Sequence, residues 1–164
     1  MSTLAVNTVQ NLSGASSMTG VGKILQTKIG TLGSDLAGSS TSFADTGLSE
    51  TITLSSTSNK LYILLSTTPY AGGSSGERFH LQIVVTPSGG ADTVVMKDIY
   101  YLYRTNDDWK SSSGFHQVLY SPSSTAQLTV KVQYKRDDGG DNLHWWSNTN
   151  SPSTNTIVLQ EVGA

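Results

Sequence analysis

The sequence has 164 residues, a length that suits one domain with a short appendage. Its formal net charge is −2 and only 13% of its residues are charged, against about 25% in typical globular proteins, which argues against nucleic acid as a partner. It has no cysteine, no signal-peptide pattern at its start and no apolar run close to the ~20 residues of a membrane-spanning helix, so the sequence predicts neither disulfides nor membrane insertion.

The first segment, residues 1–22, combines a strand-like stretch with a flexible link rich in Ser and Gly. Because it is too short to fold alone, we expect an extended N-terminal arm that lies against another protein. Its apolar side chains Leu4, Val6 and Val9 are the residues expected to make that attachment. Residues 23–164 are expected to form one head domain.

Apolar and polar residues alternate along six segments of the head, which is the pattern of β-strands. The segments are residues 23–29, 51–54, 61–66, 78–85, 127–134 and 156–162, with residues 30–47 as a connection. Residues 61–66 are apolar on nearly both faces, which predicts a central strand. Only two residues follow the last segment, which needs a neighbouring strand to hold it. The 25 Ser and 20 Thr residues suit exposed strand faces and turns.

Turn-forming residues separate these strands, and no window carries a helical stripe. The turn signals lie at residues 72–76, 87–90, 121–124 and 137–140. The sequence therefore predicts an all-β fold: an antiparallel, jelly-roll-like β-sandwich with an extended N-terminal arm. The loops around residues 70–77, 104–114 and 136–142 are expected to meet solvent or a partner.

Aromatic residues are the best candidates for ligand binding, because Tyr and Trp present flat apolar faces with a polar edge. The predicted binding residues are Tyr100, Trp109, Trp146 and the loop carboxylates Asp107 and Asp108. Alternation along the strand sends Tyr100 to one face and Ile99 and Tyr101 to the other. The alternative is that these aromatic residues belong to the core or to a subunit interface.

Two arrangements of polar residues resemble metal sites only weakly. Clustered oxygens at Asp137, Asp138, Asp141 and Asn142 suit Ca²⁺, but their spacing is not that of a known calcium loop, and Asp-Asp-Gly-Gly is also an ordinary hairpin turn. His80, His116 and His144 lack ligand-like spacing. No nucleophile elbow, zinc motif or phosphate loop is present, so we expect neither an enzyme nor a cofactor.

Several segments together resemble one family, the fibre-type virion structural proteins of marine bacteriophages. The similar segments are residues 2–10 (start), 23–26 (first head strand), 41–48 with 51–61 (first hairpin), 120–125 with 128–133 (late hairpin) and 156–162 (closing strand). The chain departs from the family's pattern at residues 97–113, where residues 99–104 are more aromatic. The resemblance implies a virion protein, usually trimeric, with an N-terminal attachment arm and a β-rich head.

We therefore expect a short fibre or spike on a bacteriophage tail or capsid, made in the host cytoplasm. Its expected partners are two further copies of itself, another phage structural protein through residues 1–22, and a glycan of the host surface. Two alternatives stay open: a capsid-decorating protein without a host ligand, and a carbohydrate-binding module.

Overall fold

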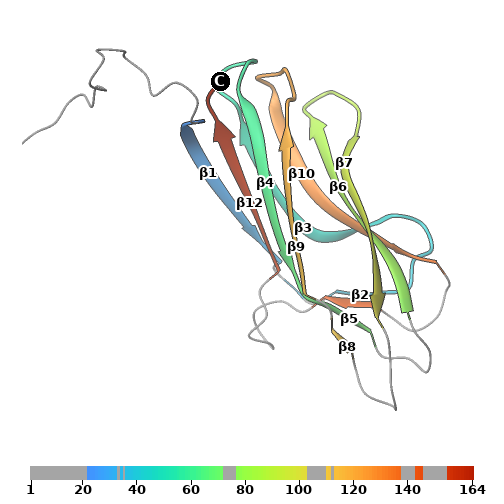
Figure 1. The fold of residues 1–164 in the computed structure, drawn as a ribbon. Coiled ribbons are helices and arrows are strands. Elements are labelled where there is room, and N and C mark those ends of the chain that lie inside the picture. The colour runs from blue at the N-terminus through green and yellow to red at the C-terminus, as the bar shows by residue number, and fades with distance from the viewer. Residues whose placement is uncertain are drawn as a thin grey trace, which may run out of the picture.

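The computed structural model describes residues 22–32, 34, 36–71, 77–102, 110–111, 113–137, 143–145 and 155–164. In this part of the chain every regular element is a β-strand (Figure 1). It contains no helix that is long and apolar enough to cross a membrane. The predicted arm, including Leu4, Val6 and Val9, lies outside the described residues.

Two four-stranded antiparallel sheets pack face to face. The first sheet contains, in spatial order, β1 (Ile24–Thr31), β12 (Thr156–Val162), β4 (Lys60–Thr67) and β9 (Gly114–Tyr120). The second sheet contains β3 (Ala44–Thr53), β10 (Gln127–Arg136), β6 (Glu77–Pro87) and β7 (Thr93–Leu102). Of the links between successive strands of these two sheets, only β6–β7 stays within one sheet, and the others cross between sheets. This is the topology of an antiparallel jelly roll, as the sequence predicted.

A small third sheet lies at one end of the sandwich, at the bottom of Figure 1. Its strands are β2 (Leu36–Gly38), β11 (Leu143–Trp145), β5 (Pro69–Ala71) and β8 (Lys110–Ser111), in that spatial order. Each comes from a different crossing connection: β1–β3, β10–β12, β4–β6 and β7–β9. The four connections that turn at this end are therefore tied to one another by strand pairing.

The core lies between the two large sheets and follows from the alternation in the sequence. Phe79, Leu81 and Ile83 of β6 are 1% exposed or less and face inward, as do Ile157 and Leu159 of β12. Burying each such side chain contributes about 1.5–3 kcal/mol to folding. The closing strand β12 pairs with β1 on one side and β4 on the other, which confirms that it is held in a sheet.

Strand pairing corrects three expectations. Residues 41–48 with 51–61 were expected to form a hairpin, but Ala44–Thr53 is the single strand β3, and the next strand, β4, belongs to the opposite sheet. The predicted late hairpin also joins opposite sheets, because β9 pairs with β4 and β10 with β3 and β6. Nor do β10 and β11, the strands that flank the predicted hairpin turn, pair with each other, since β11 pairs with β2 and β5. Alternation shows which face of a strand is buried but not which strand pairs with it.

The turn predicted at residues 87–90 is confirmed, the turn predicted at residues 72–76 lies outside the described residues, and one connection contains more structure than expected. Residues 87–90 lie in the β6–β7 hairpin, where Gly89 adopts a positive φ of 73° that L-residues rarely tolerate. The predicted connection over residues 30–47 contains β2 and the start of β3.

The described ends of the chain lie together, at the end of the sandwich opposite the third sheet. Ile24 at the start of β1 pairs with Val162 at the end of β12, and the Gly163 amide donates a hydrogen bond to the Lys23 carbonyl at 2.8 Å. Residue 22 therefore enters the head at the end marked C in Figure 1, far from the third sheet.

Candidate functional site

Strands that flank the predicted contact loops all reach the third-sheet end. The segments outside the described residues between β5 and β6, between β7 and β8, and between β10 and β11 start or finish there. The described strand ends that flank the three predicted loop regions therefore lie at one end of the sandwich, although their sequence positions are far apart. Asp107, Asp108, Trp109 and Trp146 themselves lie outside the described residues.

Tyr100, a predicted binding residue, lies in the core. Its side chain is only 8% exposed and its ring stacks on Phe79, with centroids 4.8 Å apart and planes 10° from parallel. Its hydroxyl contacts Nε2 of His116 on β9, so it bridges the two sheets. Burial raises the pKa of Tyr100 to about 12. The structure therefore favours the alternative reading of Tyr100 as a core residue, and this ring offers no binding surface.

The next residue, Tyr101, is the exposed aromatic ring of this strand. It is 54% exposed on the outer face of β7, and its cross-strand neighbour on β6 is Arg78. Ile99 is exposed on the same face and pairs with His80. Asp137, directly after β10, accepts contacts from both Arg78 and His80. We call this set, Arg78, His80, Ile99, Tyr101 and Asp137, the Tyr101 corner.

Electrostatics hold the polar side of the Tyr101 corner in its charged form. A hydrogen bond with the Tyr101 side chain and the charge of Asp137 raise the pKa of Arg78. Desolvation would raise the pKa of Asp137, but the hydrogen bond from His80 and the charges of His80 and Arg78 outweigh it and lower that pKa. Near neutral pH, the corner thus presents a flat ring beside a cation and a carboxylate.

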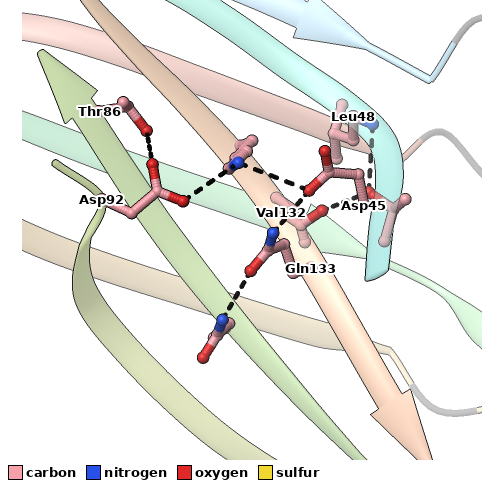
Figure 2. A network of polar contacts seen from close by, with 9 residues as sticks. Asp45, Leu48, Thr86, Asp92, Val132 and Gln133 are labelled. Atoms are coloured by element: carbon pink, nitrogen blue, oxygen red, sulfur yellow. Dashed lines mark hydrogen bonds and ion pairs between the residues drawn. The ribbon is translucent and has the colours of Figure 1, made fainter. Parts of the chain in front are cut away.

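A separate network of polar contacts crosses the outer face of the second sheet (Figure 2). Gln82 donates a hydrogen bond to Gln133 at 2.6 Å, and Gln133 donates one to Asp45 at 2.7 Å. Lys131 Nζ lies 3.9 Å from Asp45 and 3.3 Å from Asp92, so it links β10 to β3 and to the β6–β7 turn. These groups pair with one another, so the face is hydrophilic and its polar groups need no partner protein to satisfy them.

The candidate metal ligands do not converge in the described residues. His80, His116 and His144 lie on β6, β9 and β11, which belong to three different sheets. No group of three or more His, Asp or Glu side chains within the described ranges is placed to hold a metal ion. Of the predicted Asp/Asn cluster, only Asp137 is described, and Arg78 and His80 contact it.

A buried carboxylate near the opposite end was not predicted from the sequence. Glu161 of β12 is 1% exposed, and its Oε1 accepts hydrogen bonds from the Ser55 amide, the Ser55 hydroxyl and Asn59 Nδ2, each at 2.6 Å. Its Oε2 accepts one from Gln26 Nε2 at 2.6 Å. Desolvation would raise the pKa of Glu161, but these hydrogen bonds outweigh it and lower the pKa to about 2.

We call Glu161 and its partners Gln26, Ser55 and Asn59 the Glu161 cluster. This cluster links the strands at the end where residue 22 enters the head. It joins β12 to β1 through Gln26 and to the β3–β4 connection through Ser55 and Asn59, while Asn59 Oδ1 accepts a hydrogen bond from the Ala164 amide at 3.2 Å. The signal that would have revealed it is parity: position 161 shares its face with Ile157 and Leu159, so its side chain had to point inward.

No protein-family model matches the chain, and no curated protein sequence matches it. A similar solved structure is the infectious bursal disease virus VP2 subviral particle, at 13% identity and a TM-score of 0.45 over 85% of this chain and 37% of that chain. Structures of the Gt and Gx strains of that virus are 12% identical, with TM-scores of 0.41 and 0.40; they cover 100% and 84% of this chain and 43% and 36% of their own. This chain spans less than half the length of those proteins.

Proposed function

We propose that this chain is a bacteriophage virion structural protein, a short fibre or spike whose jelly-roll head recognises the host surface. The arm of residues 1–22 attaches it to another phage protein, through Leu4, Val6 and Val9. Its role is mechanical and recognitional rather than catalytic, it needs no cofactor, and it joins the virion after synthesis in the host cytoplasm. This proposal combines the family resemblance of the sequence segments with the geometry of the head.

One observation supports this proposal most strongly: the head has two structurally different ends. Residue 22 enters beside the Glu161 cluster, where hydrogen bonds from Ser55, Asn59 and Gln26 tie the strands together. All four connections that contribute to the third sheet turn at the opposite end. A head attached by residues 1–22 therefore directs its third-sheet end away from the particle.

The Tyr101 corner supplies chemistry that suits a sugar. The ring of Tyr101 offers an apolar surface on which a pyranose can stack, while Arg78 donates and Asp137 accepts hydrogen bonds beside it. The loop residues Asp107, Asp108, Trp109 and Trp146 are proposed to extend this surface. A single exposed corner binds weakly, and a homotrimer would present three of them, which raises avidity without new contacts.

Immunogold labelling of intact particles that carry this protein tests the virion role. Gold at the tail supports a tail fibre, and gold spread uniformly over the shell supports the capsid-decorating alternative. Particles that remain unlabelled while the free protein is present would contradict any virion role. In the same particles, Val6→Asp or Val9→Asp should leave the head folded but detached.

A carbohydrate-binding module is the second candidate, and the Tyr101 corner is the observation that favours it. Mass measurement of the full chain separates the two candidates, since a module needs no self-association. A full-length monomer that binds host polysaccharide would favour the module and contradict the fibre.

A further inference from the structure

The outer face of the first sheet is unusually free of charge. Its side chains are Thr27, Ile29 and Thr31 of β1; Thr156, Val158, Gln160 and Val162 of β12; Lys60, Tyr62, Leu64 and Ser66 of β4; and Phe115, Gln117 and Leu119 of β9. The single charge, Lys60, sits at the first position of its strand. We call this surface the neutral face.

Large apolar side chains protrude from the neutral face. Phe115 is 66% exposed, Ile29 62% and Leu119 57%, on the two edge strands, while Leu64 and Val158 fill the middle and are half-buried. The register places Ile29, Val158 and Leu64 in one row across the sheet. Contiguous exposed apolar surface of this kind marks an interaction site more often than a bare protein surface.

The edge strand β9 lacks the protection that the other three edges of the sandwich have. Charged residues on edge strands discourage pairing with other chains. They occur on β1 (Lys28), β3 (Asp45 and Glu50) and β7 (Lys97 and Asp98). Strand β9, Gly114–Tyr120, has no Lys, Arg, Asp or Glu, and within the described residues it pairs only with β4. An unprotected edge beside an apolar face indicates that β9 is covered in the assembled protein.

The lack of charge on the neutral face indicates which kind of partner can bind it. A strongly charged partner would find no complement on the neutral face, whereas two copies of this face bring together no like charges away from the Lys60 rim. The outer face of the second sheet, by contrast, carries Asp45, Lys131 and Asp92, which already pair with one another. The surface that suits the neutral face best is therefore another neutral face.

We propose that the neutral face, centred on Phe115 and Leu119 of β9, is the contact between copies of this chain. Four strands with seven paired rows span about 450 Å² of flat area per copy, using spacings of about 4.8 Å and 3.4 Å. Two copies together reach roughly 900 Å² before side-chain relief, close to the ~1,000 Å² of a specific interface. Two identical faces in contact close a dimer, so this contact is separate from the homotrimer of the proposed function and does not depend on the virion role.

The test is the mass of the full chain in solution, measured by light scattering over a range of concentrations. The wild type should have a mass that is a multiple of 17.4 kDa. The double variant Phe115→Asp/Leu119→Asp should have a dissociation constant roughly a hundredfold higher. Ile99→Asp is the matched control, because it places the same charge on an exposed apolar position, 46% exposed, of the edge strand β7 in the other sheet. It should keep the wild-type mass, and circular dichroism should show all three proteins folded.

A cysteine variant keeps the proposal testable if the double variant does not fold. The chain has no native cysteine, so Leu119→Cys carries the only thiol. A short bis-maleimide should link two copies of Leu119→Cys and leave Ile99→Cys unlinked. An oligomer that survives the double variant, or equal linking at both positions, would overturn the neutral-face contact while leaving a trimer possible. A wild-type chain that is monomeric at every concentration would overturn both, and would leave the face to another protein or to residues 1–21.

Discussion

Replacing Glu161 with Gln isolates the buried carboxylate that fastens the end of β12. Both carboxylate oxygens accept hydrogen bonds, from Ser55 and Asn59 on one side and from Gln26 on the other. An amide can place its oxygen toward only one side, so its nitrogen must face a donor. We expect Glu161→Gln to leave at least one buried hydrogen bond unmade and to remove the charge that strengthens the rest.

The pKa of Glu161 sets the size of the effect. The folded protein lowers it from 4.5 to about 2, and each pKa unit corresponds to about 1.4 kcal/mol, so the ionised carboxylate contributes roughly 3 kcal/mol to folding. Because the folded-state pKa is the lower one, this contribution is complete above the unfolded value of 4.5 and is lost as the pH falls towards about 2. Glu161→Gln should therefore be most costly near neutral pH.

Urea unfolding of the full chain near neutral pH and at about pH 3 measures this dependence. The wild type should exceed Glu161→Gln by roughly 3 kcal/mol near neutral pH, and the difference should shrink in acid. Glu50→Gln is the control, since Glu50 is half-buried and its carboxylate accepts a hydrogen bond from the Thr51 amide. Equal stability of Glu161→Gln and wild type, or a difference that does not change with pH, would refute the role of the ionised carboxylate.

Four further substitutions test the core, the neutral face and the Tyr101 corner. Gly114→Ala would place a methyl group against the Tyr100 hydroxyl, so it should lower the free energy of unfolding by about 1–3 kcal/mol in urea titrations. An unchanged free energy of unfolding would show that the Tyr100 side chain moves aside at little cost. Leu159→Asp should abolish the cooperative thermal transition because that side chain is fully buried, whereas Val158→Asp, on the neutral face, should keep it; equal unfolding by both would contradict the assigned faces. Tyr101→Ala should keep the thermal midpoint within a few degrees and abolish binding to host polysaccharide in a pull-down assay, and unchanged binding would exclude the corner as the sugar site.

Alternation in the sequence predicted the buried faces of β4, β6 and β10 because each of these strands has one face that is largely apolar. The set Phe79, Leu81, Ile83 and Val85 on β6 is fully inward, as the pattern requires. The pattern also placed Tyr100 and Tyr101 on opposite faces. It could not say which of them is buried, because Ile99 and Tyr101 make the other face of β7 equally apolar.

Pairing between strands was harder to predict, because a jelly roll sends most successive strands to opposite sheets. Among the links between successive strands of the two large sheets, only β6–β7, with Gly89 and Gly90, is a tight hairpin of the kind that turn residues predict. Short strands such as β8, Lys110–Ser111, form through pairing with distant segments and are too short to show an alternation of apolar and polar residues. The Glu161 cluster likewise depends on contacts between residues far apart in the sequence, which no local pattern reports.

Cryo-electron microscopy of intact particles that carry this protein tests the two-ended head most directly. The orientation of the jelly roll can be read from its asymmetry, since the third sheet marks one end and the joined start of β1 and end of β12 mark the other. The proposed function predicts the β1 start against the particle and the third sheet with the Tyr101 corner facing outward. A head bound to the particle through its third sheet, with residue 22 facing solvent, would contradict it.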